Sequence, residues 1–362
     1  MNAPMPRPSI LDIKPYKGGD GTLPGFENTI RLASNEGALG PSPKVIEVLN
    51  NSNLELHRYP DGGATMLREG IGQHFDHDPE RIVCGAGSEQ LISAICRAYA
   101  GPGDEVLMSE HAFVWYSIVA KAVGATPVKV PEPNLYADVD ALLSCVTGKT
   151  KILFLANPNN PTGTAIGACE LKRLHAGLRD NILLVVDSAY AEFIEWTEYS
   201  TGADLVDAAR NVIMTRTFSK LYALSALRIG WAYGTPEMID TINRVRSPFN
   251  VNSAAQVAGL TALEDKEHNE KTRAHTTRWR TCLTHVMREL GYEVPDSLGN
   301  FILVRFPVEP GKTAQDADQY LRDKGIITRA QGSVGLPDCL RISIGTEPEM
   351  RAIMDAMEAF VG

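Results

Sequence analysis

Short apolar runs recur through the middle of the chain. EVLMS, KILFLA, ILLVVD, NVIMT and IGWAYG begin at positions 105, 151, 182, 211 and 229. Segments compatible with helices lie between several of them, such as ACELKRLHAGLRD at 168–180, and SEQLISAICRAYA at 88–100 places its apolar residues on one helical face. Short buried strands that alternate with helices predict an α/β fold with a mostly parallel sheet covered on both faces.

The pattern changes after about residue 236. Helical segments continue to about residue 291, and the strand-like runs NFILVRF, IITRA and CLRISIG then begin at 300, 326 and 339, with helix-like TAQDADQYLRDKG between the first two. A chain of 362 residues also exceeds what one hydrophobic core usually supports. We therefore predict an N-terminal arm at 1–40, a large domain at 41–274 and a smaller α/β domain at 275–362.

Composition narrows the classes of function. The formal net charge of −9 disfavours a nucleic-acid-binding protein. The six cysteines lie far apart without the spacing of a metal site, so we expect buried thiols in a reducing compartment. The start of the chain lacks the apolar core of a signal peptide and no 18-residue apolar run occurs, so we expect a cytoplasmic protein that does not enter membranes.

Polar residues follow three of the predicted strands. NPNNPTG, DSAY and RTFSK come directly after KILFLA, ILLVV and NVIMT, and supply Asn160, Asp187, Tyr190, Ser219 and Lys220. Ligands of open parallel sheets collect at the carboxyl ends of the strands. The sequence therefore predicts that these side chains meet in one crevice.

The residue types at this crevice have a shared chemistry. Lys220 is either a solvated surface lysine or, among apolar neighbours and near Arg228, an amine of depressed pKa that can form a Schiff base with an aldehyde. Asp187 either caps a following helix or pairs with a buried cation such as a protonated pyridine. The glycine-rich turn CGAGSEQ, with Ser88 expected as the N-cap, can bind an anion at a helix start. An aldehyde, a pyridinium and a phosphate together describe pyridoxal 5′-phosphate (PLP).

The order and spacing of NPNNPTG, DSAY and TFSKLYALSALRIG resemble the fold-type I PLP-dependent aminotransferases. The further segments LASNEGALGPSP, RYPDG, GAGSEQLI, SPFNVN, GNFILVRF and LRISIGT are similar to the histidinol-phosphate branch of that superfamily. The resemblance implies a large domain whose mostly parallel, seven-stranded sheet lies between helices, and a smaller C-terminal α/β domain.

The resemblance also implies roles toward the cofactor. Lys220 would hold PLP covalently, Asp187 would pair with the ring nitrogen, and Asn160 and Tyr190 would bond the ring's 3′-oxygen. Phosphate contacts are implied for Ser219, Arg228 and the backbone around Ser88 and Glu89. Phe113 would stack on the ring, where many relatives carry tyrosine. Tyr59, in RYPDG, resembles a tyrosine that reaches the partner's cofactor phosphate, which implies a homodimer.

Substrate contacts follow from the same resemblance. Arg341 is placed for the anionic end of the substrate and Arg329 for the substrate phosphate, and the alternative for both is an ordinary surface ion pair. Tyr16 and Asn35 resemble residues of an N-terminal arm that closes over substrate. The segment SNEGALG departs from the commoner NENPLG pattern by losing a proline, so we expect a looser arm.

The implied reaction is transamination between L-histidinol phosphate and 2-oxoglutarate in histidine biosynthesis. An aromatic-amino-acid aminotransferase and a PLP decarboxylase acting on a phosphorylated amino acid are alternatives with the same cofactor set. From other classes come a PLP-binding regulator, a non-catalytic PLP-binding protein and a structural homodimer. We expect no DNA-binding domain, because only about 30 residues precede the first motif.

Overall fold

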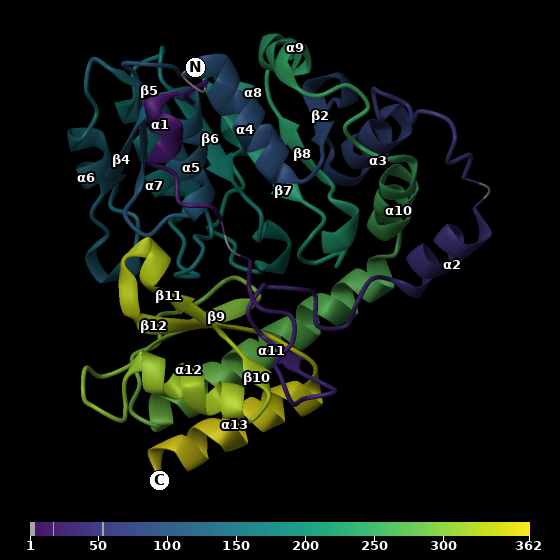
Figure 1. Cartoon of the computed structure of the whole chain (residues 1–362). Coiled ribbons are helices and arrows are strands. Elements are labelled where there is room, and N and C mark those ends of the chain that lie inside the picture. Colours follow the sequence, from purple (N-terminus) through teal and green to yellow (C-terminus); the bar gives the residue numbers. More distant parts are fainter. Residues whose placement is uncertain (1–3, 17, 53) are drawn as a thin grey trace.

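The predicted sheet is present in the computed structural model, which describes residues 4–16, 18–52 and 54–362. Its seven strands lie in the order β2-β8-β7-β6-β5-β3-β4 (Figure 1). They are β2 (Ile82–Gly85), β3 (Glu105–Ser109), β4 (Thr126–Val130), β5 (Thr150–Ala156), β6 (Leu183–Asp187), β7 (Val212–Thr217) and β8 (Gly230–Tyr233). The pairs from β4 to β7 are parallel, whereas β8 runs antiparallel to both β7 and β2. The expected α/β class with a mostly parallel seven-stranded sheet is thereby confirmed.

The continuous apolar runs reflect burial of both faces of this sheet. Alternate residues of one strand enter different cores: Ile152 and Phe154 of β5 face one, while Leu153 and Leu155 face the other. The first core is closed by α4 (Ser88–Tyr99), α5 (Val114–Val123) and α9 (Pro236–Val245). The second is closed by α3 (Thr65–Phe75), α6 (Val139–Ser144), α7 (Ala168–Gly177), α8 (Ala203–Ala208) and α10 (Ser253–Glu264).

A second, smaller body forms below the large sheet in Figure 1. It holds the antiparallel sheet β11-β12-β9, built from β11 (Arg329–Gln331), β12 (Leu336–Ser343) and β9 (Phe301–Arg305). Its helices are α11 (Lys266–Glu289), α12 (Ala314–Asp323) and α13 (Glu347–Val361). Because α11 is continuous from the neighbourhood of α10 into this body, it passes through the predicted boundary at 274/275. The exact domain limits stay a prediction.

The N-terminal segment connects the two bodies. The short helix α1 (Pro8–Leu11) packs against α5, and the chain then descends so that β1 (Ile30–Arg31) pairs in parallel with β10 (Ile326–Ile327) (Figure 1). After this segment, α2 (Pro43–Asn51) lies at the margin of the molecule beside α10. The remaining short 3-10 turns are Pro79–Arg81, Pro133–Leu135, Ala191–Phe193, Ser225–Leu227 and Gly332–Val334.

The helices α10 and α11 meet at Asp265, whose carboxylate accepts from the His268 amide and so caps α11. Two local expectations were wrong. Ser88 is the first residue of α4 and not its N-cap, because Gly87 takes the cap position with a φ of 80° that favours glycine. Of the six free cysteines, Cys169 and Cys282 are exposed and not buried, since both lie on outer helical faces. In the described part of the chain, no helix has the length and apolar character needed to cross a membrane.

Candidate active site

A cavity of about 280 Å³ lies where the carboxyl ends of the large sheet meet the small sheet. Every site residue predicted from the sequence lines it, with the exception of Tyr59. These residues are Tyr16, Asn35, Ser88, Glu89, Phe113, Asn160, Asp187, Tyr190, Ser219, Lys220, Arg228, Arg329 and Arg341. The prediction that three strand ends meet in one crevice is therefore confirmed. The role of each residue stays a prediction.

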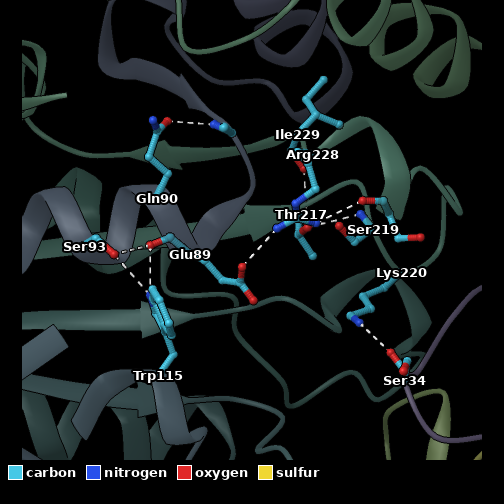
Figure 2. Close-up of polar contacts among 12 residues, drawn as sticks. Ser34, Glu89, Gln90, Ser93, Trp115, Thr217, Ser219, Lys220, Arg228 and Ile229 are labelled. Carbon is cyan, nitrogen blue, oxygen red and sulfur yellow. Dashed lines mark hydrogen bonds and ion pairs between the residues drawn. The ribbon is translucent and has the colours of Figure 1, made fainter. Parts of the chain in front are cut away.

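Lys220 lies half-buried at the wall of this cavity, three residues beyond the end of β7. Its Nζ points toward the N-terminal arm and donates to the carbonyl oxygens of Ser34 at 3.5 Å (Figure 2) and of Asn35 at 3.3 Å. Burial lowers the pKa of Lys220 to about 8, and the positive charges of Arg341 and Arg228 act in the same direction. An amine of this kind is a usable nucleophile and base near neutral pH, which is the property expected of it.

Asp187 ends β6 at the base of the cavity and is 6% exposed. Its Oδ2 accepts from the Tyr116 hydroxyl at 2.6 Å and its Oδ1 from the Thr215 hydroxyl at 3.1 Å. Burial raises the pKa of Asp187, and the hydrogen bonds from Tyr116 and Thr215 oppose that rise. Asp187 caps none of the described helices and pairs with no described lysine or arginine. A buried carboxylate held in this way suits a cationic ligand atom.

The start of α4 forms one corner of the cavity. The Arg228 guanidinium forms an ion pair with the Glu89 carboxylate at 3.0 Å there (Figure 2). Two glycines make this close approach possible. A Cβ on Gly87 would lie 2.6 Å from Nη2 of Arg228, and a Cβ on Gly230 would lie 2.4 Å from the Ser88 nitrogen. The helix start, Ser219 and Arg228 thus line one concave corner suited to an anion.

Two arginines enter the cavity from the small sheet. Arg329 of β11 and Arg341 of β12 are direct partners in the antiparallel register. Arg341 is 9% exposed and donates from Nη1 to Oδ1 of Asn160 at 2.5 Å and from Nη2 to the Ala33 carbonyl at 2.5 Å. Its Nε is buried without a hydrogen-bond partner among the described residues. Burial lowers the pKa of Arg341, and the charge of Arg329 contributes to this.

The arm residue Asn35 connects the two bodies across the cavity. Its side chain donates to the Tyr190 hydroxyl at 2.9 Å and accepts from the Ser343 hydroxyl at 3.0 Å. Asn35 is buried and has a φ of 53°, a region that asparagine tolerates better than most residues. Tyr16 lines the same cavity but is 54% exposed. The arm therefore forms part of the cavity wall, although its SNEGALG segment departs from the commoner pattern.

Tyr59 lies outside this cavity. It is 82% exposed and stacks on Phe249 with 4.5 Å between ring centroids. Its predicted reach into a partner's site concerns a second chain and stays a prediction.

Sequence reasoning did not identify Tyr116, Thr215, Thr217 or Ser225. Tyr116 and Thr215 bond Asp187, Thr217 accepts from the Ser219 amide at 3.1 Å (Figure 2), and Ser225 lines the cavity. The threonines alternate along β7 at 215 and 217, a polar signal inside a buried strand. Tyr116 gave no such signal because it falls on the apolar face of α5.

The residues present fit PLP. An amine of low pKa can hold the aldehyde, a buried carboxylate can pair with the ring nitrogen, and the glycine-lined corner at α4 can hold the phosphate. Phe113 stands at the cavity wall, with its ring edge-to-face against Tyr116 at 5.8 Å and 88°. The cavity wall therefore offers an aromatic ring as well as the three polar contacts.

The chain is similar to known proteins over nearly its whole length. The family model for aminotransferase class I and II matches residues 27–357. The histidinol-phosphate aminotransferase of Paramagnetospirillum magneticum is 56% identical, with all of both chains covered. That of Rhodospirillum centenum is 52% identical over 99% of this chain and 98% of its own. A crystal structure of the Sinorhizobium meliloti histidinol-phosphate aminotransferase in complex with PLP superposes with a TM-score of 0.91 at 26% identity, covering 98% of this chain and 96% of that one. The resemblance seen in the sequence is confirmed, and the chain belongs to the class I and II aminotransferase family.

Proposed function

We propose that the protein transfers an amino group between L-histidinol phosphate and 2-oxoglutarate, using PLP, in histidine biosynthesis. The choice of substrate rests on two arginines of the small sheet, Arg329 and Arg341. They lie opposite each other in the strand register and line the same cavity as Lys220. A doubly charged phosphate suits two neighbouring guanidinium groups, because each can bind its oxygens with charge-assisted hydrogen bonds.

The same observation favours this substrate over an aromatic amino acid. An aromatic amino acid presents a single anionic group to the enzyme, its carboxylate, and one arginine suffices for that. A phosphorylated amino alcohol presents a dianion of higher charge density. The relatives from Paramagnetospirillum magneticum, Rhodospirillum centenum and Rhodospirillum rubrum are named histidinol-phosphate aminotransferase. This chain matches them over nearly their full lengths, which supports the same choice.

The chemistry follows from the residues around the cavity. When bound, PLP supplies an aldehyde and a ring that accepts electron density from the α-carbon of the substrate. Lys220 carries the proton transfer, since an amine with a pKa of about 8 can take a proton from that carbon and return it. Asn160 and Tyr190 would orient the ring through its 3′-oxygen, and Asp187 would hold it at its nitrogen. The buried arm residue Asn35 donates to the Tyr190 hydroxyl and so holds that side chain in place.

We also propose a cytoplasmic homodimer in which Tyr59 contacts the partner's cofactor phosphate. Large apolar side chains are exposed around α2, α3 and the loop before α10, namely Ile46, Leu56, Tyr59, Met66 and Phe249. Of these, Tyr59 and Phe249 stack on each other, and exposed large apolar side chains in neighbouring segments are typical of a subunit interface. The six free cysteines suit a reducing compartment.

Mixing two defective variants tests the shared site. Lys220→Ala and Tyr59→Ala chains, dissociated and reassociated together, should regain activity, because a mixed dimer contains one site with both native residues. Random pairing of symmetric dimers limits the recovery to about a quarter of the native value. If the mixture is no more active than its components, the two residues do not act across an interface.

A spectral titration tests the substrate. Holoenzyme is mixed in turn with L-histidinol phosphate, glutamate and phenylalanine, and conversion of the yellow cofactor band to the amine form is followed. We expect conversion at low concentrations of histidinol phosphate and glutamate and only at much higher concentrations of phenylalanine. A preference for phenylalanine would establish the aromatic alternative, and a protein without a chromophore that responds to any donor would establish the non-catalytic one.

A further inference from the structure

Tyr116 is the closest described neighbour of the buried carboxylate at the base of the cavity. It is fully buried in α5, and its hydroxyl donates to Oδ2 of Asp187 at 2.6 Å. Its ring stacks on Phe154, with 4.5 Å between ring centroids and 5° between ring planes, and packs edge-to-face against Phe113. Because the ring cannot move without disturbing this packing, the hydroxyl is held at one position relative to Asp187.

Thr215 completes the arrangement on the other oxygen. Its hydroxyl donates to Oδ1 of Asp187 at 3.1 Å from the neighbouring strand β7. Burial and the negative charge of Asp187 hold the pKa of Tyr116 well above its usual value, so the phenol keeps its proton and acts as a donor. Each carboxylate oxygen can accept a further hydrogen bond beside the one it already has. Asp187 is therefore anchored from two sides and still able to meet a ligand.

We propose that Tyr116 is a positioning residue that keeps the proton on the ring nitrogen of bound PLP through its hydrogen bond to Asp187. This inference rests on the proposed function. A proton shared between a carboxylate and a pyridine nitrogen resides on the stronger base of the two. Donors to the carboxylate make it a weaker base, and a buried site magnifies that effect. With Tyr116 and Thr215 both donating, the proton stays on the ring nitrogen, where it makes the ring the better electron acceptor.

The test measures the ring nitrogen directly. Holoenzyme is reconstituted with PLP carrying ¹⁵N in the ring, and the native protein is compared with Tyr116→Phe by NMR. Phenylalanine preserves the ring that packs on Phe154 and removes only the hydroxyl. We expect the native nitrogen to resonate as a pyridinium and the variant to shift toward neutral pyridine. Loss of one charge-assisted hydrogen bond should lower kcat roughly 10-fold while KM changes little.

Two further variants keep the test decisive. Tyr233→Phe is the matched control, because Tyr233 donates to Asp207 at the same 2.6 Å and neither residue lines the cavity; its ring-nitrogen resonance should match the native one. Thr215→Val removes the longer hydrogen bond to Asp187 and should shift the ring-nitrogen resonance less, in the same direction. This variant replaces Tyr116→Phe in the test if Tyr116→Phe does not retain PLP. An unchanged nitrogen resonance in a PLP-loaded Tyr116→Phe or, failing that, Thr215→Val overturns the inference. A native protein that binds no PLP overturns the proposed function instead.

Discussion

Two walls of the same cavity carry their charges in different ways. One, the cofactor wall, consists of Asp187, which ends β6, and of Lys220 and Arg228, which lie between β7 and β8 of the large sheet. Arg228 is paired with Glu89, and Asp187 holds hydrogen bonds from Tyr116 and Thr215. Lys220 donates to carbonyl oxygens of the arm, so each charged group of this wall has a hydrogen-bond partner within the chain itself.

The other, the substrate wall, consists of Arg329 and Arg341 on β11 and β12. Their guanidinium groups have the same sign and the same register position, and the Nε of Arg341 is buried without a partner among the described residues. The cofactor is common to every amino donor, whereas the anionic groups of the donors differ, so the residues that contact those groups set the preference between donors. Changes in the cofactor wall should therefore affect every substrate alike, and changes in the substrate wall should discriminate between substrates.

The largest expected effect comes from the cofactor wall. Lys220→Ala removes the amine that moves the proton, so transamination of glutamate and of histidinol phosphate should both fall by roughly 10⁴-fold or more. The yellow cofactor band should be lost as well, measured by absorbance after loading with PLP and dialysis against cofactor-free buffer. Lys172→Ala, at an exposed lysine paired with Asp204, is the control and should behave as the native protein. Substantial activity in the Lys220 variant would contradict the assignment of the base.

A selective loss is expected from the substrate wall. Arg329→Gln should lower kcat/KM for histidinol phosphate roughly 100-fold through the loss of charge-assisted bonds to phosphate, while glutamate and the cofactor spectrum change little. Arg341→Gln should impair both substrates, because the resemblance assigns it to their common anionic end. Arg351→Gln, at an exposed arginine paired with Glu347, is the control. Equal losses of both substrates in Arg329→Gln would remove the distinction between the two walls.

The cofactor wall could be predicted from the sequence because its signals are local. Buried parallel strands appear as continuous apolar runs, and the polar residue that ends each run necessarily lies at the same edge of the sheet. The apolar runs alone are enough to locate Asn160, Asp187 and Lys220 at that edge, and the resemblance then supplies their roles.

Other features depend on tertiary pairing that no local pattern reveals. The register that places Arg329 opposite Arg341 is set by the bulged pairing of β11 and β12. Tyr116 looks like an ordinary core residue on α5, since only the fold brings it to Asp187 from 71 positions away in sequence. The sequence predicts the N-cap of α4 at Ser88, because serine is a commoner N-cap than glycine. The cap lies at Gly87 because the close approach of Arg228 leaves no room for a Cβ there.

The low pKa of Lys220 offers a pH test of the cofactor wall. Only the neutral amine captures PLP, so the capture rate of the apoprotein should rise with pH and level off above about 8, where an ordinary lysine would continue to gain up to about 10.5. Below that point the rate should change about tenfold per pH unit, measured by stopped-flow absorbance. Arg341→Gln removes a positive charge that lowers this pKa, so its plateau should begin at higher pH. A native plateau near 10 would mean that Lys220 is not perturbed.

The smallest effect concerns the arm that joins the two walls. A Cβ on Gly37 would lie 2.5 Å from the Cβ of Ala223 and 3.2 Å from the Lys220 carbonyl, so Gly37→Ala must displace the arm from the loop that carries the base. Overpacking of this kind costs about 1–3 kcal/mol.

Because Asn35 bonds both Tyr190 and Ser343 of β12, a displaced arm weakens both walls together. We therefore expect KM to rise a few-fold for glutamate and histidinol phosphate alike, with kcat less affected. Gly101→Ala is the control, since its added Cβ meets nothing within 4 Å and Gly101 does not line the cavity. A change confined to histidinol phosphate would show that the arm serves the substrate wall alone, and unchanged KM values would show that the loop yields and the arm stays in place.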